Sequence, residues 1–289
     1  KIESNPSVYH LGFMLGPRIN AGGRVGKCSH GANLLINKDP KNTFKIASEL
    51  DQYNKERQML ERDLLQRILN KKTSYLKDPV IIISGSNWHE GVIGIVAARL
   101  KDKFNKPVII ISMEGKIGKA SARSIVGFDI GSIILAATQE SILLKGGGHK
   151  MAGGFSIKIE NIEKFKNYVF RKFRNINEDL SSDKPLMLDS VISPSAVNLE
   201  FYNKIALLSP FGSGNPEPKF IIENIKTVNG NVVGEKHIKS ILIGNDGSTI
   251  KSIAFNAVDN DFEGYLIKKN NKTFNIAGKL SLNEWKGQS

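Results

Sequence analysis

Hydrophobic and polar positions change their spacing twice along the chain. Between Thr43 and Asn70, apolar residues recur every three or four positions and charged residues occupy the rest. This spacing predicts one amphipathic helix of about 28 residues, roughly 42 Å long at 1.5 Å per residue. Residues 1–40 are rich in glycine, and we expect them to be mostly loop. Residues 41–74 are therefore predicted to be a long connector between two regions of different composition.

After the predicted connector helix, continuous apolar runs alternate with amphipathic segments. The runs Val80–Ser84 and Pro107–Ser112 are typical of buried strands, and another strand is expected at Gly154–Ile159. Helices are expected at residues 91–104, 129–138 and 160–174. Buried strands that alternate with helices predict an α/β domain over residues 75–176.

A polar stretch at residues 175–184 is interpreted as a linker, and an all-β pattern follows it. Strands are expected at Leu186–Val191, Phe220–Val228, Val232–Gly234, Ile238–Ile243, Ile250–Phe255 and Phe274–Leu280, with one helix near residues 195–208. The dipeptides Asn229-Gly230 and Asp246-Gly247 are typical of turns between strands. The pattern predicts a small β-barrel over residues 183–289, and an OB-fold has a matching number of strands. A final strand is expected beyond Ser289.

Composition indicates the kind of partner and the environment that suit the chain. The net charge is +13 over 289 residues, which favours a polyanionic partner such as nucleic acid. Lys, Asn and Ile are all frequent, so mutational bias in an AT-rich genome is the alternative explanation of the charge. Cys28 is the only cysteine, which excludes an internal disulfide and fits a reducing cytoplasm. No stretch reaches the roughly 18 apolar residues of a membrane span.

The segment Lys145–Phe155 contains five glycines and one histidine just before an alternating run. Glycines let a backbone approach a ligand closely, and successive exposed N–H groups form an anion-binding concavity. Gly147 and Gly148 are therefore candidate phosphate-binding residues, and His149 is a candidate catalytic residue that would donate to the scissile or an adjacent phosphate. The alternative is a turn whose histidine bonds to its own backbone.

This segment resembles the Gly-Gly-His loop of the DHH-associated domain in the DHH phosphoesterase superfamily. Three further regions, in the same order, resemble RecJ-type single-strand-specific 5′→3′ exonucleases: Gly16–Arg24, Trp88–Arg99 with Gly118–Ser124, and Pro210–Phe220. The resemblance implies α/β plus all-β architecture, with a DHH-associated domain preceded by a long connector helix and followed by an OB-fold barrel. It also implies that residues 1–40 are the C-terminal tail of a DHH catalytic domain.

Two of these regions carry candidate phosphate ligands. Arg18 follows Pro17, and a guanidinium on a rigid loop suits bidentate phosphate contact, with Asn20 and Arg24 as further donors. The alternative is an arginine that caps a helix or pairs with a carboxylate. The resemblance implies that Arg18 faces the catalytic cleft.

In Gly118–Ser124, residues Ser121 and Arg123 would point to the same side of an extended segment and could hold a phosphate. The alternative is an edge strand with a polar face. The resemblance implies phosphate binding near the 5′ end of a strand by Ser121 and Arg123, and Ser124 is a further candidate phosphate ligand.

Weaker candidates for nucleic-acid binding come from two places. His89 precedes a predicted helix start and could help its N–H groups bind an anion, while Trp88 could stack a base or pack beneath the sheet edge. In the predicted barrel, cations lie beside aromatic residues, an arrangement that suits single-stranded nucleic acid, although barrels also need aromatic cores. The barrel candidates are Lys236, His237 and Lys239, with Phe255 and Trp285 as stacking residues.

The five histidines show no pairing at metal-ligand spacing, and no Asp-His-His occurs. The resemblance implies a cofactor of Mn²⁺ or Mg²⁺ held mainly by an upstream domain, so we expect no complete active site in this chain. The implied activity is hydrolysis of single-stranded DNA from its 5′ end to mononucleotides, in DNA repair and recombination. Expected partners are single-stranded DNA and a single-strand-binding protein or a helicase, for a cytoplasmic monomer without membrane association. The alternatives are a DHH-type phosphodiesterase of short oligonucleotides or cyclic dinucleotides, and a non-catalytic single-strand-binding scaffold.

Overall fold

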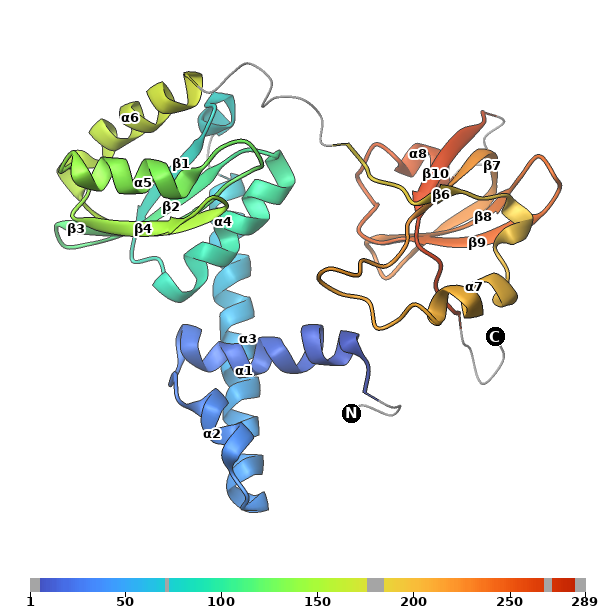
Figure 1. Ribbon diagram of the computed structural model, residues 1–289, viewed down its shortest axis with the longest axis horizontal. Coiled ribbons are helices and arrows are strands. Elements are labelled where there is room, and N and C mark those ends of the chain that lie inside the picture. Colours follow the sequence, from blue (N-terminus) through green and yellow to red (C-terminus); the bar gives the residue numbers. More distant parts are fainter. Residues whose placement is uncertain (1–5, 71–72, 176–184, 268–271, 284–289) are drawn as a thin grey trace. The chain divides into compact units, whose positions relative to one another are not determined.

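The computed structural model describes residues 6–70, 73–175, 185–267 and 272–283. The chain divides into two compact units, Lys1–Asp183 and Lys184–Ser289 (Figure 1). No helix in the described ranges is both long enough and apolar enough to cross a bilayer.

The N-terminal segment is helical where we expected loops. A short π-helix η1 (His10–Leu15) leads into α1 (Gly16–Val25), and α2 (His30–Ile36) follows. Pro17 lies in the first turn of α1, directly after η1, so helical backbone continues through Leu15 and Gly16 into α1. Buried Ala21 and Gly22 face α3 (Pro40–Asn70), and a Cβ on Gly22 would lie 3.1 Å from Leu50 Cδ2. Tertiary packing on α3 therefore overrides the low helix propensity of the glycines.

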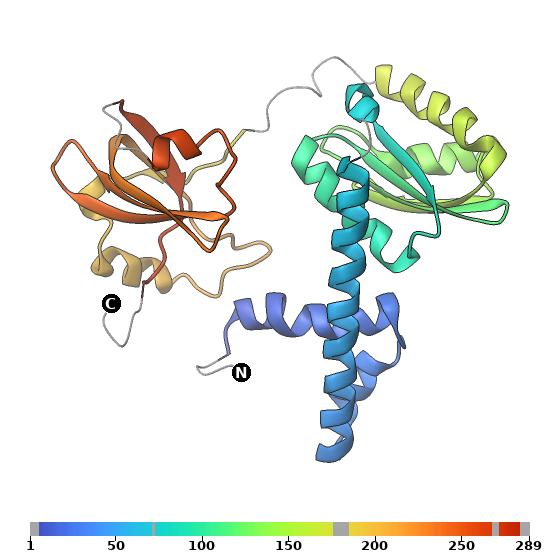
Figure 2. The ribbon, with the colours of Figure 1, turned by 180° about the vertical axis from the view of Figure 1, so that it is seen from behind.

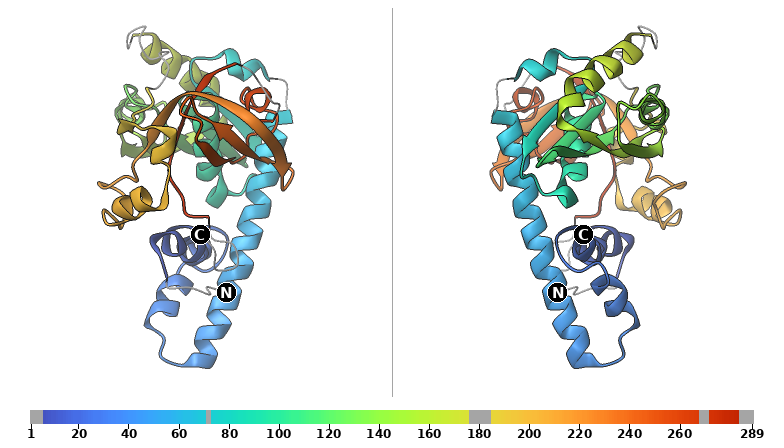
Figure 3. Two further views of the ribbon diagram at one scale, coloured as in Figure 1. Left: turned by 90° about the vertical axis from the view of Figure 1, so that its right-hand side faces the viewer. Right: turned by 90° about the vertical axis from the view of Figure 1, so that its left-hand side faces the viewer.

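The predicted connector helix is confirmed as α3, which has 31 residues and extends three residues further toward the N-terminus than expected. Its two ends belong to different clusters of elements: α1 and α2 pack along one end, and the other reaches the sheet (Figures 2 and 3). Buried Leu64 and Ile68 pack with the residues of α4 (Glu90–Phe104). Glu61, only 2% exposed, bonds to Arg57 at 2.8 Å and also pairs with Arg99 of α4.

A five-stranded sheet forms the centre of the first unit, in the order β1-β2-β3-β5-β4. Its strands are β1 (Ile81–Ser86), β2 (Val108–Glu114), β3 (Ile117–Arg123), β4 (Lys145–His149) and β5 (Ala152–Lys158). The first two strands are parallel and joined by α4, and the other neighbours are antiparallel. Helix α4 and the end of α3 cover one face, and α5 (Ile130–Gln139) and α6 (Ile162–Arg174) cover the other. Short 3₁₀ turns η2 (Thr73–Lys77) and η3 (Ile159–Asn161) complete the unit.

The glycine segment was predicted to be a loop, but residues 145–149 form the edge strand β4. Leu144 N–H donates to Ser156 O at 2.9 Å, and the ladder continues to the His149–Ala152 pair. The amides of β4 therefore alternate in direction, and the expected concavity of successive N–H groups does not form.

The second unit contains a sheet in the order β10-β7-β8-β9, with β6 parallel to β7. Its elements are β6 (Ser190–Val191), η5 (Pro194–Ala196), α7 (Leu199–Ala206), β7 (Phe220–Val233), β8 (His237–Ile243), β9 (Thr249–Ala254), α8 (Glu263–Leu266) and β10 (Phe274–Gly278). Ile222, Ile225, Ile238 and Leu242 are buried in its core.

The turn expected at Asn229-Gly230 is wrong, because both residues lie inside β7. Gly230 is buried beneath α8, where a Cβ would lie 1.8 Å from Leu266 O, so this glycine permits close packing and not chain reversal. The chain reverses instead at Gly234 and Glu235, which have φ of +58° and +64°. The turn at Asp246-Gly247 is confirmed between β8 and β9.

Candidate phosphate-binding site

Strand β3 presents its polar side chains to α4 and its small side chains to the core. Ala120 and Ala122 are buried, whereas Ser121 and Arg123 lie on the opposite face. The predicted same-side arrangement is confirmed, since Arg123 Nη1 donates a hydrogen bond to Ser121 Oγ at 3.1 Å. The edge-strand alternative is wrong, because β3 lies between β2 and β5.

A second arginine reaches the same place from the end of α1. Arg24 Nη1 donates to Gly91 O in the first turn of α4, at 3.3 Å. Burial lowers the pKa of half-buried Arg123, and the positive charge of Arg24 lowers it further. In the ranges that the structure describes, neither guanidinium forms an ion pair with a carboxylate. Two neighbouring cations and a hydroxyl without a counter-ion make a favourable place for an anion.

The sheet register adds His149 to this surface. Arg123 pairs with Ala152, and Ala152 with His149, so these three residues form one row across β3, β5 and β4. Side chains of one row point to the same face, and residues two strands apart are separated by roughly 10 Å. The neighbouring row contains Ser121, Gly154 and Gly147.

The row next to Arg123, Ala152 and His149 contains two glycines and is open. Gly147 and Gly154 are exposed; a Cβ at Gly147 would meet no atom within 4 Å, and one at Gly154 only Ala120 O, at 3.4 Å. Gly148 serves a different purpose, because its Cβ position is 2.6 Å from Gly153 Cα and only glycine permits this strand contact. We call the surface formed by Ser121, Arg123, His149, Gly147 and Gly154 the glycine platform.

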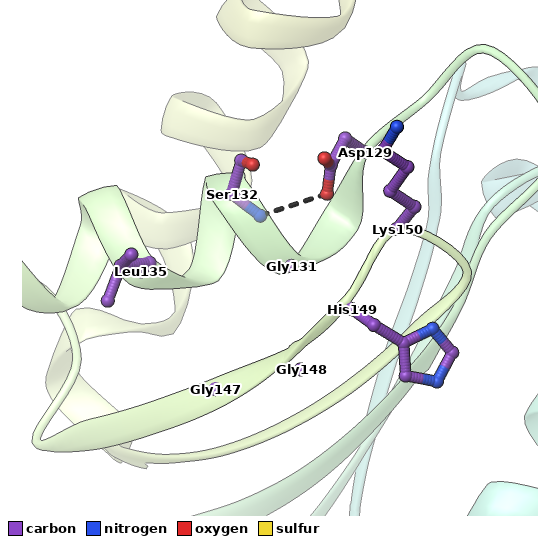
Figure 4. Close-up of a pocket in the computed structure, with 8 residues that line it drawn as sticks. All are labelled: Asp129, Gly131, Ser132, Leu135, Gly147, Gly148, His149 and Lys150. Atoms are coloured by element: carbon purple, nitrogen blue, oxygen red, sulfur yellow. Dashed lines mark hydrogen bonds between the residues drawn. The ribbon is translucent and has the colours of Figure 1, made fainter.

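The contacts of His149 match in part the alternative of a histidine that bonds to the backbone of its own segment. Its Nδ1 accepts a hydrogen bond from Met151 N–H at 3.3 Å, while the ring is exposed. In Figure 4 the ring points away from Asp129, which belongs to a pocket of about 350 Å³ between β4 and α5. The Asp129 carboxylate caps α5 by accepting from Ser132 N–H at 3.0 Å, a contact that lowers its pKa. An acidic group thus already occupies the helix N-terminus in this pocket, which disfavours an anion there.

Arg18 lies on helix α1 and not on the rigid loop that we expected. Its Nε donates to Asp51 Oδ1 at 2.8 Å and its Nη1 donates to Met14 O at 2.7 Å. Bonds from Lys55 and from Arg18 hold the pKa of Asp51 below its ordinary value. The geometry thus matches the alternative of an arginine paired with a carboxylate. Asn20 is exposed on the same helix.

Three other predicted ligands have structural contacts. The structure contradicts a ligand role for Ser124, because its hydroxyl is buried and donates to Phe128 O at 2.6 Å. His89 caps α4, its Nδ1 accepting from Gly91 N–H at 3.1 Å, and so uses a donor that an anion would take. Trp88 is partly buried against the core cluster of α4, and a Cβ on Gly85 would lie 2.2 Å from its ring.

In the second unit, the predicted nucleic-acid ligands lie at one end of the β8–β9 face. The rings of His237 and Phe255 are in edge contact at 5.3 Å, and Phe255 is 69% exposed. Lys239 is exposed two residues further along β8, and Lys236 is exposed just before the strand. Trp285 lies outside the described residues. A cation–aromatic surface of this kind is able to stack bases and contact phosphates.

A metal site was not predicted in this chain. Among the residues that the structure describes, no group of three or more His, Cys, Asp or Glu side chains could hold a metal ion. The side chains of the glycine platform likewise supply no carboxylate, so they do not fit a divalent cation.

Comparison with known proteins defines the class of each part. The DHHA1 domain model matches residues 73–175, and the RecJ OB domain model matches residues 188–289. The fold is therefore a DHH-associated α/β domain followed by an OB domain, which confirms the predicted fold class.

The relatives identify the family. The single-stranded-DNA-specific exonuclease RecJ of Bacillus subtilis is 30% identical over 95% of this chain and 35% of its own length. The protein of the same name from Escherichia coli K12 is 31% identical over 96% of this chain and 49% of its own length. A crystal structure of RecJ from Thermus thermophilus in complex with Mn²⁺ matches with a TM-score of 0.82 and 27% identity, covering 98% of this chain and 40% of that one. The chain belongs to the RecJ family, as the sequence motifs predicted, and it spans between a third and a half of these two relatives.

Proposed function

We propose that the protein to which this chain belongs is a single-stranded-DNA-specific exonuclease that digests from the 5′ end, in DNA repair and recombination. The names of the relatives support the substrate class, and the surface around Arg123 supports a role for this chain in holding the substrate. The observation that carries the proposal is the meeting of Arg24, Arg123 and Ser121 without a carboxylate partner in the described residues. A terminal phosphate supplies the charge that such a site lacks.

Each part of the chain has a distinct task in this proposal. Arg123 and Ser121 bind the 5′-terminal phosphate, with Arg24 adding positive charge, because charge-assisted hydrogen bonds to phosphate are the strongest that side chains form. The glycine platform lets the sugar-phosphate backbone approach the sheet, and exposed His149 contacts a neighbouring phosphate. Arg18 remains a candidate contact to the strand. Lys236, His237, Lys239 and Phe255 hold the strand further along by stacking and phosphate contacts.

The hydrolytic centre is proposed to lie outside this chain. Crystal structures of the Thermus thermophilus relative contain Mn²⁺ or Mg²⁺, and we propose the same cofactors here. Among the described residues no cluster of ligands for such an ion occurs, and we propose that its ligands lie in another part of the protein. The chain alone is then a binding module without hydrolytic activity.

Binding measurements with this chain test the proposal. Oligonucleotides of one sequence are compared as single strands with a 5′-phosphate, as single strands with a 5′-hydroxyl, and as duplex, each over a range of salt concentrations. We expect preference for single strands, a steep salt dependence and tighter binding with the 5′-phosphate. The phosphate gain is the increase in affinity for the 5′-phosphorylated strand over the 5′-hydroxyl strand. Arg123→Ala should remove most of this gain, roughly a 10- to 100-fold effect for the loss of a charge-assisted contact. An equal loss for phosphorylated and unphosphorylated strands would refute the terminal-phosphate role.

A further inference from the structure

Gly94 lies in the interior of α4, where glycine is among the least favourable residues for helix formation. Its φ is not in the left-handed region, and α4 continues without interruption from Glu90 to Phe104. Backbone conformation therefore does not require a glycine at this position. Packing is the remaining explanation.

The atoms around Gly94 belong to the phosphate site. A Cβ built on Gly94 would lie 2.9 Å from Ser121 Oγ and 3.0 Å from Arg123 Nη2, with Arg123 Cζ next at 3.7 Å. These are the polar ends of two side chains, so an alanine would displace them without striking the core or the backbone. A glycine one turn earlier differs, because a Cβ on Gly91 would lie 1.9 Å from the backbone oxygen of Arg24. Gly91 thus determines how closely α1 approaches, and Gly94 determines only where the hydroxyl and the guanidinium lie.

We propose that Gly94 is a positioning residue for the anion site on β3. Without a side chain at this position, the Arg123 guanidinium lies against α4 and keeps its 3.1 Å hydrogen bond to Ser121 Oγ. A methyl group there pushes both polar ends outward and separates the donors that must converge on one phosphate. The identity of the ligand as a 5′-phosphate rests on the proposed function, whereas the effect on Ser121 and Arg123 does not.

The test compares three variants of this chain. Gly94→Ala is measured beside Arg123→Ala and the control Gly12→Ala, whose Cβ would meet no atom within 4 Å in a distant helical segment. Each variant is assayed by thermal unfolding and by its affinity for 5′-phosphorylated and 5′-hydroxyl single strands of the same sequence. A crystal structure of Gly94→Ala shows the two side chains without any ligand.

We expect Gly94→Ala to unfold at the same temperature or about 2–4 °C higher, since alanine is the better helix former. Its gain from the 5′-phosphate should fall by roughly tenfold, toward that of Arg123→Ala, while affinity for the hydroxyl-ended strand stays within about twofold. The control should keep the full gain.

Three results would overturn the inference. The first is a Gly94→Ala protein that keeps the phosphate gain, and the second is a crystal structure of that protein in which the Arg123–Ser121 bond is unchanged. The third is loss of cooperative unfolding, which would show that the glycine serves the fold. If the unmodified chain has no phosphate gain at all, the proposed function fails, and the crystal structure alone decides whether Gly94 positions the two side chains.

Discussion

Removing the buried carboxylate of Glu61 should weaken the first unit far more than removing an exposed carboxylate from the same helix. Glu61 is 2% exposed and bridges Arg57 of α3 to Arg99 of α4, and the side chain of Arg57 is itself only 12% exposed. Glu61→Ala leaves the Arg57 charge buried, with Asn54 Oδ1 at 2.9 Å as its remaining bonded side chain among the described residues. Breaking one partner of a buried ion pair typically costs about 3–5 kcal/mol.

The exposure of Arg99 reduces the expected loss of unfolding free energy. Its side chain is 57% exposed and can turn toward water, so we expect about 3 kcal/mol, at the lower end of the range. For a unit of this size, that loss corresponds to a fall in Tm of roughly 6–12 °C. The control is Asp63→Ala, which removes the partner of Arg67 at 3.0 Å, a pair with side chains 54% and 66% exposed. Exposed pairs of this kind contribute about 0.3–0.5 kcal/mol.

Thermal or urea unfolding of the two variants and the parent chain measures the difference directly. Equal, small losses for Glu61→Ala and Asp63→Ala would refute the reasoning, because they would mean that burial does not control the strength of these pairs. A loss confined to Glu61→Ala would support α3 and α4 being held together by this bridge. Since α1 packs on both helices, that bridge also bears on how Arg24 meets Arg123.

Three further outcomes are expected. Phe255→Ala should weaken single-strand binding by about 1–3 kcal/mol without changing the slope of log K against log salt concentration. Lys239→Ala should reduce that slope by about 0.7. The opposite pattern in salt titrations would contradict the assigned roles. Ser124→Ala should lower the unfolding free energy by about 1 kcal/mol yet keep the 5′-phosphate gain that Arg123→Ala loses, and a lost gain would return Ser124 to the site. The pKa of Asp129 is held below its ordinary value of 3.8, chiefly by Ser132 N–H, so its stabilising effect is complete above about pH 4 and disappears as pH falls through the lowered folded-state value. Asp129→Asn, which can cap without titrating, should flatten this part of the acid unfolding profile, and an unchanged profile would exclude the effect.

The sequence was most informative where a single period governs the structure. A two-residue period was enough to place Ser121 and Arg123 on one side of a strand, and a three- to four-residue period was enough to find α3. The glycine run has no period of its own, so only its pairing with β5 makes it a strand. For the same reason, its side chains could not be assigned to a face before the register was known.

Contacts between distant segments were beyond sequence reasoning. Arg24 was recognised only as a secondary donor, because its approach to Arg123 depends on α1 packing against Gly91, far away in the chain. The Asp51 partner of Arg18 likewise became visible only when α1 and α3 were placed side by side. The buried hydroxyl of Ser124 shows the converse limit, since a polar residue inside a motif can serve the loop and not the ligand.

Because the glycine platform is open, substitutions of its glycines should affect folding and strand binding to different extents. A methyl group at Gly147 would meet no atom within 4 Å, and one at Gly154 would meet only a carbonyl oxygen, at 3.4 Å. Folding therefore places little constraint on a Cβ at these positions, and a screen for expression or solubility would pass alanine there. If the proposed function holds, a screen that requires a DNA strand to lie on the platform would reject these substitutions, and the difference between the two screens would outline the proposed substrate path residue by residue.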